Sequence, residues 1–261
     1  MKKRIDQWLV ESGLASSRTQ AKDLIENKQV VIYFDNKKQF VLKANQTFSI
    51  EDLNNSLRPE ILVGEIGKYV SRAGLKLAGA LDQLKLKVDN YKVLDVGVST
   101  GGFSEVLLQR GALQVFGLDV GHDQTHEILK SNARFFLFEG VNAKELIQRS
   151  DITGQFPAEG FDLVVMDVSF IRSELIWPQI SPYFNKNGKL LSLIKPQFEG
   201  GAAALNKKGV VKDEGLYISL QQKLEKLVAQ LGFQKLDYFE SSIKGKEGNR
   251  EFFLFAQKEG I

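Results

Sequence analysis

The sequence predicts an α/β protein that has a mostly parallel, seven-stranded sheet and a small α+β module in front of it. Beyond about residue 69, short apolar runs of strand length alternate with amphipathic stretches of helical period, which is typical of a parallel sheet with crossover helices. Residues 1–58 have another pattern, in which two short helical stretches precede a hairpin. A polar stretch over residues 59–68 has the composition of a linker. We therefore expect a small domain over 1–58, a linker over 59–68 and a large domain over 69–261.

The composition is that of a globular protein, with 43% hydrophobic and 26% charged residues. At 261 residues the chain is long enough for one large domain and a small one. It contains no cysteine, which excludes disulfides, thiolate metal sites and a cysteine nucleophile. The net charge of +3 is small, so contact with a nucleic acid must come from local clusters of lysine and arginine.

The amino terminus, Met1–Asp6, is charged, and no apolar segment of a secretory signal follows it. No apolar run approaches the ~18 residues that a transmembrane helix needs. We therefore expect a cytoplasmic protein without a membrane partner and, because no dimer seam is evident, a monomer. His122 and His126 are spaced for one helix face, but no carboxylate pattern accompanies them, so we expect a helix start there and no metal.

In the small module, the apolar spacing from Ile5 to Val10 predicts a short helix that ends near Gly13. Ser16 or Ser17 can cap a second helix, Arg18–Glu26. Its apolar side is distinct from the face that carries the two basic residues at positions 18 and 22.

A hairpin follows these two helices. Val30–Tyr33 and Phe40–Leu42 have strand composition, and the polar turn Asp35–Lys38 lies between them. The next stretch, Glu51–Lys68, is polar and contains glycine and proline, so we interpret it as leading out of the module.

The large domain is predicted as seven strands and five helices, with no internal repeat. The strands are Lys92–Val96, Gln114–Asp119, Phe135–Phe138, Asp162–Asp167, Lys189–Ile194, Phe233–Glu240 and Glu251–Ala256. The helices are Ser71–Leu84, Phe103–Arg110, Ala143–Arg149, Ile171–Tyr183 and Glu214–Leu231.

The most specific local motif is a glycine loop between the first of these strands and its helix. Glycines let the backbone approach a ligand, and the loop runs from Gly97 through Ser99 to a pair of glycines. A dinucleotide fingerprint needs G-x-G-x-x-G, whereas here the order is Gly-x-x-x-Gly-Gly, so a nicotinamide dehydrogenase is disfavoured. The next strand ends in Asp119, about 20 positions after Gly97, where an acid suits ribose hydroxyls.

Four residues far apart in the chain are predicted to meet at the open edge of the sheet: Lys76, Asp167, Lys195 and Glu251. Asp167 and Lys195 each close an apolar strand-like run, and Glu251 opens the last one. Ligands of open α/β sheets bind outside the carboxyl ends of the strands. A ribose hydroxyl is too weakly acidic to ionise unaided, so it needs a base or a cation that stabilises the alkoxide. Two lysines beside two carboxylates therefore predict chemistry on such a hydroxyl.

The small module resembles the S-four-like RNA-binding domain. The resemblance is carried by Arg4-Ile5-Asp6, Gly13-Leu14-Ala15, Ser17-Arg18, Ala21, Leu24-Ile25 and Val30. It implies that a basic helix face contacts the phosphates and shape of RNA. On this basis we expect RNA contacts from Arg4, Arg18, Lys22, Lys28 and, at the start of the large domain, Arg72.

The large domain resembles the FtsJ-type ribose 2′-O-methyltransferases, and the whole chain resembles the TlyA family, which joins an S-four-like module to that domain. The carrying segments are Tyr69–Leu77, Leu94–Phe103, Asp167–Ile171, Lys195–Glu199, Gly209–Asp213 and Gly248–Phe253. The resemblance implies a Rossmann-like S-adenosylmethionine methyltransferase fold, with the quartet as its Lys-Asp-Lys-Glu tetrad. Lys195 would accept the proton or stabilise the alkoxide, Asp167 would position the lysine and the methyl donor, and Glu251 would orient the other side.

The same resemblance implies S-adenosyl-L-methionine as the cofactor. Its expected binding residues are Asp95, Gly97, Ser99, Thr100, Gly101, Gly102, Phe103, Asp119, Asn142 and Asp167. Asn142 is equally well explained as a helix cap. The stretch Gly121–His126 departs from the usual family sequence Gly-Tyr-Gly-Gln-Leu, so the contacts on the adenine side are expected to differ.

The expected function is therefore 2′-O-methylation of a ribose, cytidine by the family resemblance, in ribosomal RNA, with ribosomal RNA or a ribosomal subunit as the partner. Two alternatives belong to other classes. A membrane-active haemolysin, a name that many family members carry, is opposed by the lack of a signal and of a spanning segment. A non-catalytic RNA-binding or ribosome-assembly factor would need a broken glycine loop or tetrad, and both are intact in the sequence.

Overall fold

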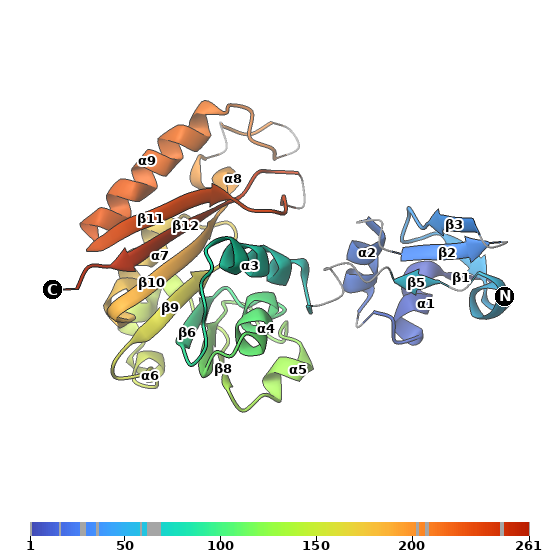
Figure 1. The fold of residues 1–261 in the computed structure, drawn as a ribbon, viewed down its shortest axis with the longest axis horizontal. Helices are drawn as coiled ribbons and strands as arrows, with labels where there is room; N and C mark the ends of the chain where they lie inside the picture. Colours follow the sequence, from blue (N-terminus) through green and yellow to red (C-terminus); the bar gives the residue numbers. More distant parts are fainter. Residues whose placement is uncertain are drawn as a thin grey trace. The chain divides into compact units, whose positions relative to one another are not determined.

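The structure is a computed structural model that describes residues 2–15, 17–26, 30–34, 37–57, 59–61, 69–201, 204–206, 209–245 and 248–260. The chain divides into two compact units, Met1–Leu75 and Lys76–Ile261. Each is described by itself below, and Figure 1 labels its helices and strands. Ser16, Lys28, part of the predicted turn at Asp35 and most of the predicted linker lie outside the described residues.

The small unit is an α+β module with its own core. Its elements are β1 (Lys2–Arg4), α1 (Ile5–Glu11), α2 (Arg18–Glu26), β2 (Val30–Phe34), β3 (Lys37–Phe40), β4 (Thr47–Ser49), a π-helical turn (Asp52–Ser56) and β5 (Glu60–Ile61). β1 pairs with β4, and β3, β2 and β5 form a second sheet. The Ser17 hydroxyl caps α2 by accepting the Gln20 amide at 3.1 Å. Apolar side chains of α1, α2 and β2 enclose the core.

The small unit extends further along the chain than its composition indicated. Leu53 and Leu57, which lie inside the predicted bounds of 1–58 but in a polar stretch, are buried in its core. Glu60–Ile61, in the predicted linker, pairs with β2 as an edge strand. Composition could not show this, because pairing of so short an edge strand depends on the partner strand rather than on its own apolar pattern. β3 also begins at Lys37, inside the predicted turn.

The large unit contains the predicted seven-stranded sheet. Its strands are β6 (Lys92–Val96), β7 (Gln114–Leu118), β8 (Phe135–Phe138), β9 (Phe161–Met166), β10 (Phe184–Ile194), β11 (Phe233–Glu240) and β12 (Phe252–Lys258). Its helices are α3 (Arg72–Gln83, which begins just before the unit boundary), α4 (Gly102–Gln109), α5 (Glu127–Lys130), α6 (Ser150–Thr153), α7 (Ser173–Ile180), α8 (Pro196–Glu199), α9 (Gly215–Gln230) and two 3₁₀ segments, Ala143–Gln148 and Ser181–Tyr183.

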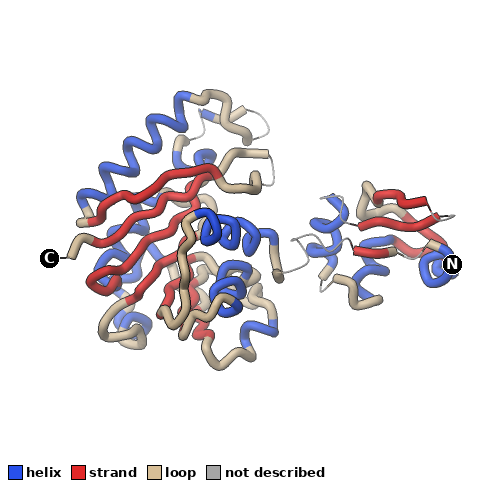
Figure 2. Tube along the Cα trace, in the orientation of Figure 1, coloured by secondary structure: helices blue, strands red, loops and turns tan. Residues whose placement is uncertain are grey.

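The strand order is β11-β12-β10-β9-β6-β7-β8, and Figure 2 shows the strands side by side. All neighbours are parallel except β12, which runs antiparallel to both β10 and β11. The chain goes from β6 outward to β8 and then returns to β9 on the other side of β6, so the order reverses between β6 and β9. Ligands of open α/β sheets bind at such a switch point.

Helices cover both faces of this sheet. The larger core joins the strands to apolar side chains of α7 and α9, among them the fully buried Trp177. α3 and α4 lie on the near face in Figure 1. This two-sided cover explains why β6 and β9 read as nearly continuous apolar runs in the sequence.

Several boundaries in the large unit differ from those predicted. The segment predicted as a helix over Ala143–Arg149 is a 3₁₀ turn with a non-helical residue, Glu145, inside it. α7 begins at Ser173 instead of Ile171, because Phe170 has a φ of +64° and Arg172 is extended. The helices α5, α6 and α8 are each four residues long, too short for a periodic signal.

No helix in the described part of the chain is long and apolar enough to cross a membrane. No group of three or more His, Asp or Glu side chains that could hold a metal ion occurs among the described residues.

Candidate active site

Two ion pairs form where the sequence predicts the quartet. In the first, Lys195 Nζ lies 2.6 Å from Asp167 Oδ1 and donates a hydrogen bond of 2.9 Å to Ser169 Oγ. The approach to Asp167 lies off the hydrogen-bond direction, so Oδ1 touches the ammonium but has no hydrogen-bond donor in the part of the chain that the structure describes. The contact is therefore an ion pair, and the lysine head group has three N–H donors, one of which is used by Ser169.

In the second pair, Lys76 Nζ donates to Glu251 Oε2 at 2.6 Å. Both side chains are buried, with 11% of Lys76 and 3% of Glu251 exposed. The other oxygen of Glu251 accepts a long contact of 3.5 Å from Gln197 Nε2. An added Cβ at Gly245 would lie 2.5 Å from that oxygen, so glycine is needed for the close approach of the preceding turn.

Sheet register explains how residues so distant in sequence reach one edge. Asp167 and Lys195 follow β9 and β10, which are parallel neighbours and therefore end together. β12 is antiparallel to β10, with Phe252 opposite Ile194, so Glu251 enters the sheet at the edge where β10 leaves it. Gln197, two residues after Lys195, contacts Glu251 and links the two ion pairs.

The predicted glycine loop lies at the same edge, against the end of β9. Gly97 has a φ of +90°, and a Cβ there would lie 2.5 Å from the backbone oxygen of Asp167. Gly101 has a φ of +99°, and a Cβ there would overlap Leu129. Backbone conformation favours glycine at both positions, and at Gly97 the nearby backbone also leaves no space for a side chain, so the loop can lie against the residues of the first ion pair.

Asp119 holds this loop from the end of β7. One of its oxygens accepts the Ser99 amide at 2.6 Å, and the other accepts the Gly121 amide at 2.7 Å. Ser99 itself has a φ of +50°, a conformation that non-glycine residues rarely adopt. Such strain at a loop held by a carboxylate is typical of a ligand-binding segment.

The segment Gly121–His126, which departs from the family sequence, packs on the glycine loop. Thr125 Oγ1 donates to the Ser99 carbonyl at 3.1 Å, and the His126 amide donates to the Thr100 carbonyl at 3.2 Å. The His126 ring caps α5 by accepting the Ile128 amide, which is the helix start expected from the sequence.

Asp95 lies beneath the loop and is fully buried. Its Oδ2 accepts the Ser104 hydroxyl at 2.6 Å, whereas its Oδ1 has no hydrogen-bond partner among the described residues. Burial, with smaller contributions from the nearby Asp167 and Asp119, raises the pKa of Asp95 to about 7 against the opposing effect of the Ser104 hydrogen bond. Three carboxyl groups thus surround the loop, and the raised pKa of Asp95 reflects how unfavourable its negative charge is there without a bound cation.

Two other expected cofactor residues have structural contacts. Phe103 is buried on Phe253, with ring centroids 6.4 Å apart, so it belongs to the packing beneath the loop. Asn142 caps the following 3₁₀ turn by accepting the Lys144 amide at 3.2 Å. This is the role of a helix cap, which was the alternative to a cofactor contact for that residue. Gly102 is buried at the first position of α4.

The sequence prediction missed an aromatic pair beside the first ion pair. Phe170 is 88% exposed and has a φ of +64°. Its ring lies 4.7 Å from that of Phe198, which follows Lys195 by three residues. The sequence signal that could have identified this pair is an aromatic residue, Phe170, three positions after the candidate acid Asp167 and beyond the end of the strand.

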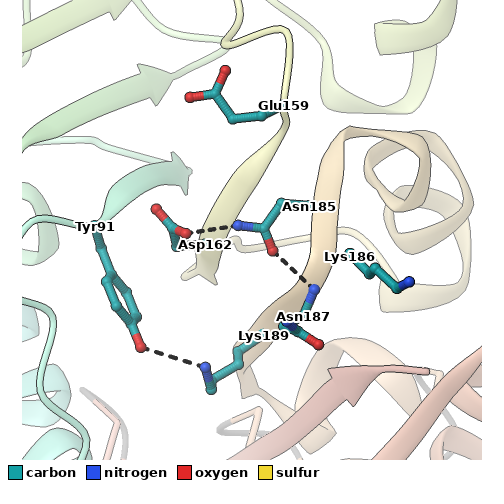
Figure 3. Close-up of a pocket in the computed structure, with 7 residues that line it drawn as sticks. All are labelled: Tyr91, Glu159, Asp162, Asn185, Lys186, Asn187 and Lys189. Atoms are coloured by element: carbon teal, nitrogen blue, oxygen red, sulfur yellow. Dashed lines mark hydrogen bonds between the residues drawn. The ribbon is translucent and has the colours of Figure 1, made fainter. Parts of the chain in front are cut away.

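A polar cavity of about 440 Å³ lies at the opposite end of the strands and is lined by Tyr91, Glu159, Asp162, Asn185, Lys186, Asn187 and Lys189 (Figure 3). Its groups bind one another: Asn185 Nδ2 donates to Asp162 at 2.6 Å, and Lys189 Nζ donates to Tyr91 at 3.4 Å. It contains none of the quartet, so it is not the candidate active site.

In the small unit, two of the expected RNA-binding arginines bind a buried acid. Arg4 donates two hydrogen bonds to Asp6, and Arg18 donates one at 3.1 Å. Burial would raise the pKa of Asp6, but these hydrogen bonds outweigh it and hold the pKa below its usual range. Lys22 pairs with Glu26 on the exposed face of α2 at 3.6 Å. The two guanidinium groups are therefore held in place at the module surface.

Comparison with known families identifies the class of both units. The family model of FtsJ-like methyltransferases matches residues 69–258, and the S4 domain model matches residues 3–32. The large unit is therefore a methyltransferase of the FtsJ-like class, with the S-adenosylmethionine methyltransferase fold, and an S4 domain precedes it. Over its full length the chain belongs to the TlyA family, which confirms the resemblance inferred from the motifs.

Two relatives and one solved structure carry this assignment. The chain is 36% identical to the 23S rRNA (cytidine-2′-O)-methyltransferase TlyA of Campylobacter jejuni, over 95% of this chain and 97% of that protein. It is 33% identical to the 16S/23S rRNA (cytidine-2′-O)-methyltransferase TlyA of Mycobacterium tuberculosis, over 98% and 90%. A Streptococcus thermophilus protein described as a hemolysin has a TM-score of 0.72 and 29% identity, over 99% and 89%.

Proposed function

We propose that this protein transfers a methyl group from S-adenosylmethionine to the ribose 2′-oxygen of a cytidine in ribosomal RNA, in the cytoplasm. The observation that carries the proposal is the Lys195–Asp167 ion pair, which lies against a strained glycine loop at the switch point of the sheet. The full-length similarity to two cytidine-2′-O-methyltransferases supports the substrate.

The residues around the glycine loop fit this cofactor. S-adenosylmethionine carries a sulfonium and an ammonium, and a cation bound beside Asp95 would favour the ionised form of this acid, whose pKa burial and the nearby Asp167 and Asp119 raise. Asp119 and the backbone from Gly97 to Gly101 would hold the cofactor, and Asp167 would lie beside its reactive end. The cofactor supplies an electrophilic methyl group.

The chain's own residues act on the hydroxyl. The Lys195 ammonium, fixed by Asp167 and Ser169, stabilises the negative charge that develops on the ribose oxygen as the hydroxyl proton passes to water. Lys76, held by Glu251 on the neighbouring strand, adds a second cation at this edge. Positioned charges of this kind are worth most where water is partly excluded, and both pairs are largely buried.

Phe170 supplies a surface for the base. Aromatic side chains bind unpaired bases by stacking, worth ~1–3 kcal/mol per base. A ring that is exposed, strained in its backbone and three residues from Asp167 is placed to stack the base whose ribose meets Lys195.

Replacing Phe170 by Ala is expected to raise the KM for ribosomal subunits by ~5–150-fold, since it removes that stacking energy. S-adenosylmethionine affinity should stay within about twofold, and Phe170→Trp should retain most activity. Steady-state methyl transfer and calorimetric cofactor binding measure these effects. Ile218→Ala, on α9, is the matched control, since Ile218 is also exposed. An unchanged KM for Phe170→Ala would refute base stacking by this ring.

The S4 unit is proposed to hold the RNA. Arg4 and Arg18, fixed by Asp6, together with Lys22, present cations suited to phosphates, and Arg72 begins α3 of the large unit. By the family resemblance, Lys28 would also contact the RNA. The protein is proposed to act as a monomer.

The proposal is tested by incubating the protein with labelled S-adenosylmethionine and ribosomal subunits from cells that lack this gene. We expect label in ribosomal RNA of one or both subunits. Binding of the cofactor without incorporation into either subunit or into naked RNA would overturn the proposed substrate.

A further inference from the structure

The loops that follow β9 and β10 are joined at three places, in the same order along both loops. The pairs are Lys195 with Asp167, Phe198 with Phe170, and Glu199 with Ser173. The first pair holds the candidate catalytic lysine, and the second holds the exposed ring proposed to stack the base. The third lies farther along both loops and takes no part in the chemistry described above.

The third pair is the most buried of the three. Glu199 is 7% exposed and Ser173 is 2% exposed. Glu199 Oε1 accepts the Ser173 amide at 2.9 Å and the Ser173 hydroxyl at 2.6 Å. Ser173 is the first residue of α7, so its amide is one of the donors that a helix start leaves unsatisfied. The carboxylate of α8 thereby ties α8 to the start of α7.

This carboxylate is costly to bury. Its Oε2 has no hydrogen-bond partner in the described part of the chain, and burial raises the pKa of Glu199 despite the bonds from Ser173. A polar group that is buried and half satisfied destabilises a fold. A buried carboxylate with one unpaired oxygen is a feature that proteins tolerate mainly at functional sites.

We infer that Glu199 is a positioning residue for methyl transfer: by fixing α8 to the start of α7, it holds Lys195 on Asp167 and Phe170 on Phe198. The inference rests on the proposed function for its kinetic consequence. The contact that carries it is the hydrogen bond between Glu199 and Ser173. Glu199 follows Lys195 by four residues, and Ser173 follows Asp167 by six.

Glu199→Ala is expected to lower kcat for ribosomal RNA by ~10–100-fold, because small displacements of reacting groups have effects of this size. Cofactor affinity is expected to stay within about twofold. Glu199→Gln keeps an oxygen that can accept both bonds from Ser173, so it should recover most of the rate. Should Glu199→Ala fail to fold, Ser173→Ala, which loses only the hydroxyl donor, replaces it with a smaller expected loss of kcat.

Asp162→Ala is the matched control for a general loss of stability. Asp162 resembles Glu199 in accepting one backbone amide, that of Lys92 at 2.7 Å, and one side-chain donor, the amide of Asn185. It lies at the opposite end of the strands from Glu199 (Figure 3). It is expected to lower the melting temperature while kcat below that temperature stays near the wild-type value. If Asp162→Ala lowers kcat as much as Glu199→Ala does, the positioning role is wrong.

Hydrogen–deuterium exchange provides a test that needs no activity. In Glu199→Ala, amides over residues 169–175 and 196–200 should exchange faster than in the wild type, while those of β9 and β10 stay protected. Wild-type incorporation together with full kcat for Glu199→Ala would overturn the inference and leave the proposed function standing. A wild type that methylates no RNA would refute the proposed function instead. Unchanged exchange in both segments would separately refute the claim that Glu199 fixes α8 to the start of α7.

Discussion

Lys195→Ala is expected to lower methyl transfer by at least ~10²–10³-fold, the effect of removing one group that stabilises charge in a transition state. The loss should appear in kcat, because the lysine acts on the ribose oxygen rather than on the cofactor. The affinity for S-adenosylmethionine should stay within about twofold, since the glycine loop is held by Asp119 and its own backbone. Single-turnover transfer and calorimetry measure the two quantities.

Lys189→Ala is the matched control for this variant. Lys189 lies on strand β10, which Lys195 follows, but toward the opposite end of that strand, where its ammonium contacts Tyr91 (Figure 3). It should transfer methyl groups at the wild-type rate. Near-normal kcat in Lys195→Ala would remove Lys195 from the chemistry, whatever the behaviour of the control.

Lys76→Met is expected to reduce both stability and activity. It leaves the carboxylate of Glu251 buried without its partner, and breaking a buried ion pair in this way costs about 3–5 kcal/mol. The measurement is denaturant unfolding. Removing an exposed pair as control, by Arg149→Met beside Asp151, should leave the free energy of unfolding nearly unchanged, because water screens an exposed pair.

The double variant Lys76→Met/Glu251→Gln separates the structural role of this pair from its chemical role. Because no charge remains buried and unpaired, stability should return most of the way to wild type. Methyl transfer should remain lost, because the second cation at the sheet edge is absent. A stable double variant with normal kcat would show that the pair serves only the fold.

Much of the fold was predictable because the strands of the large unit are buried on both faces. The ranges Lys92–Val96, Phe135–Phe138 and Phe233–Glu240 were predicted with the bounds that the structure has. Elements stabilised by their partners were not predictable. β5 exists through pairing with β2, and the start of α7 is set by the left-handed backbone of Phe170.

The candidate site was predictable to the level of which residues meet, and less so in their pairing. The sequence placed the quartet at one sheet edge, and strand order brings its members there. It did not show that Lys76 pairs with Glu251 and Lys195 with Asp167, because pairing depends on side-chain packing. The bridges made by Ser169, Gln197 and Glu199 were missed for the same reason, since each is a single polar residue without a pattern of its own.

The most direct test of the central claim is the chemical position of the transferred methyl group. Labelled ribosomal RNA from the wild-type reaction is digested to nucleosides and analysed by mass spectrometry, with the Lys195→Ala reaction alongside. The arrangement of two lysine–carboxylate pairs beside the glycine loop predicts 2′-O-methylcytidine in the wild-type reaction and its absence in the variant. Label on a base, or equal 2′-O-methylcytidine in both reactions, would contradict the account.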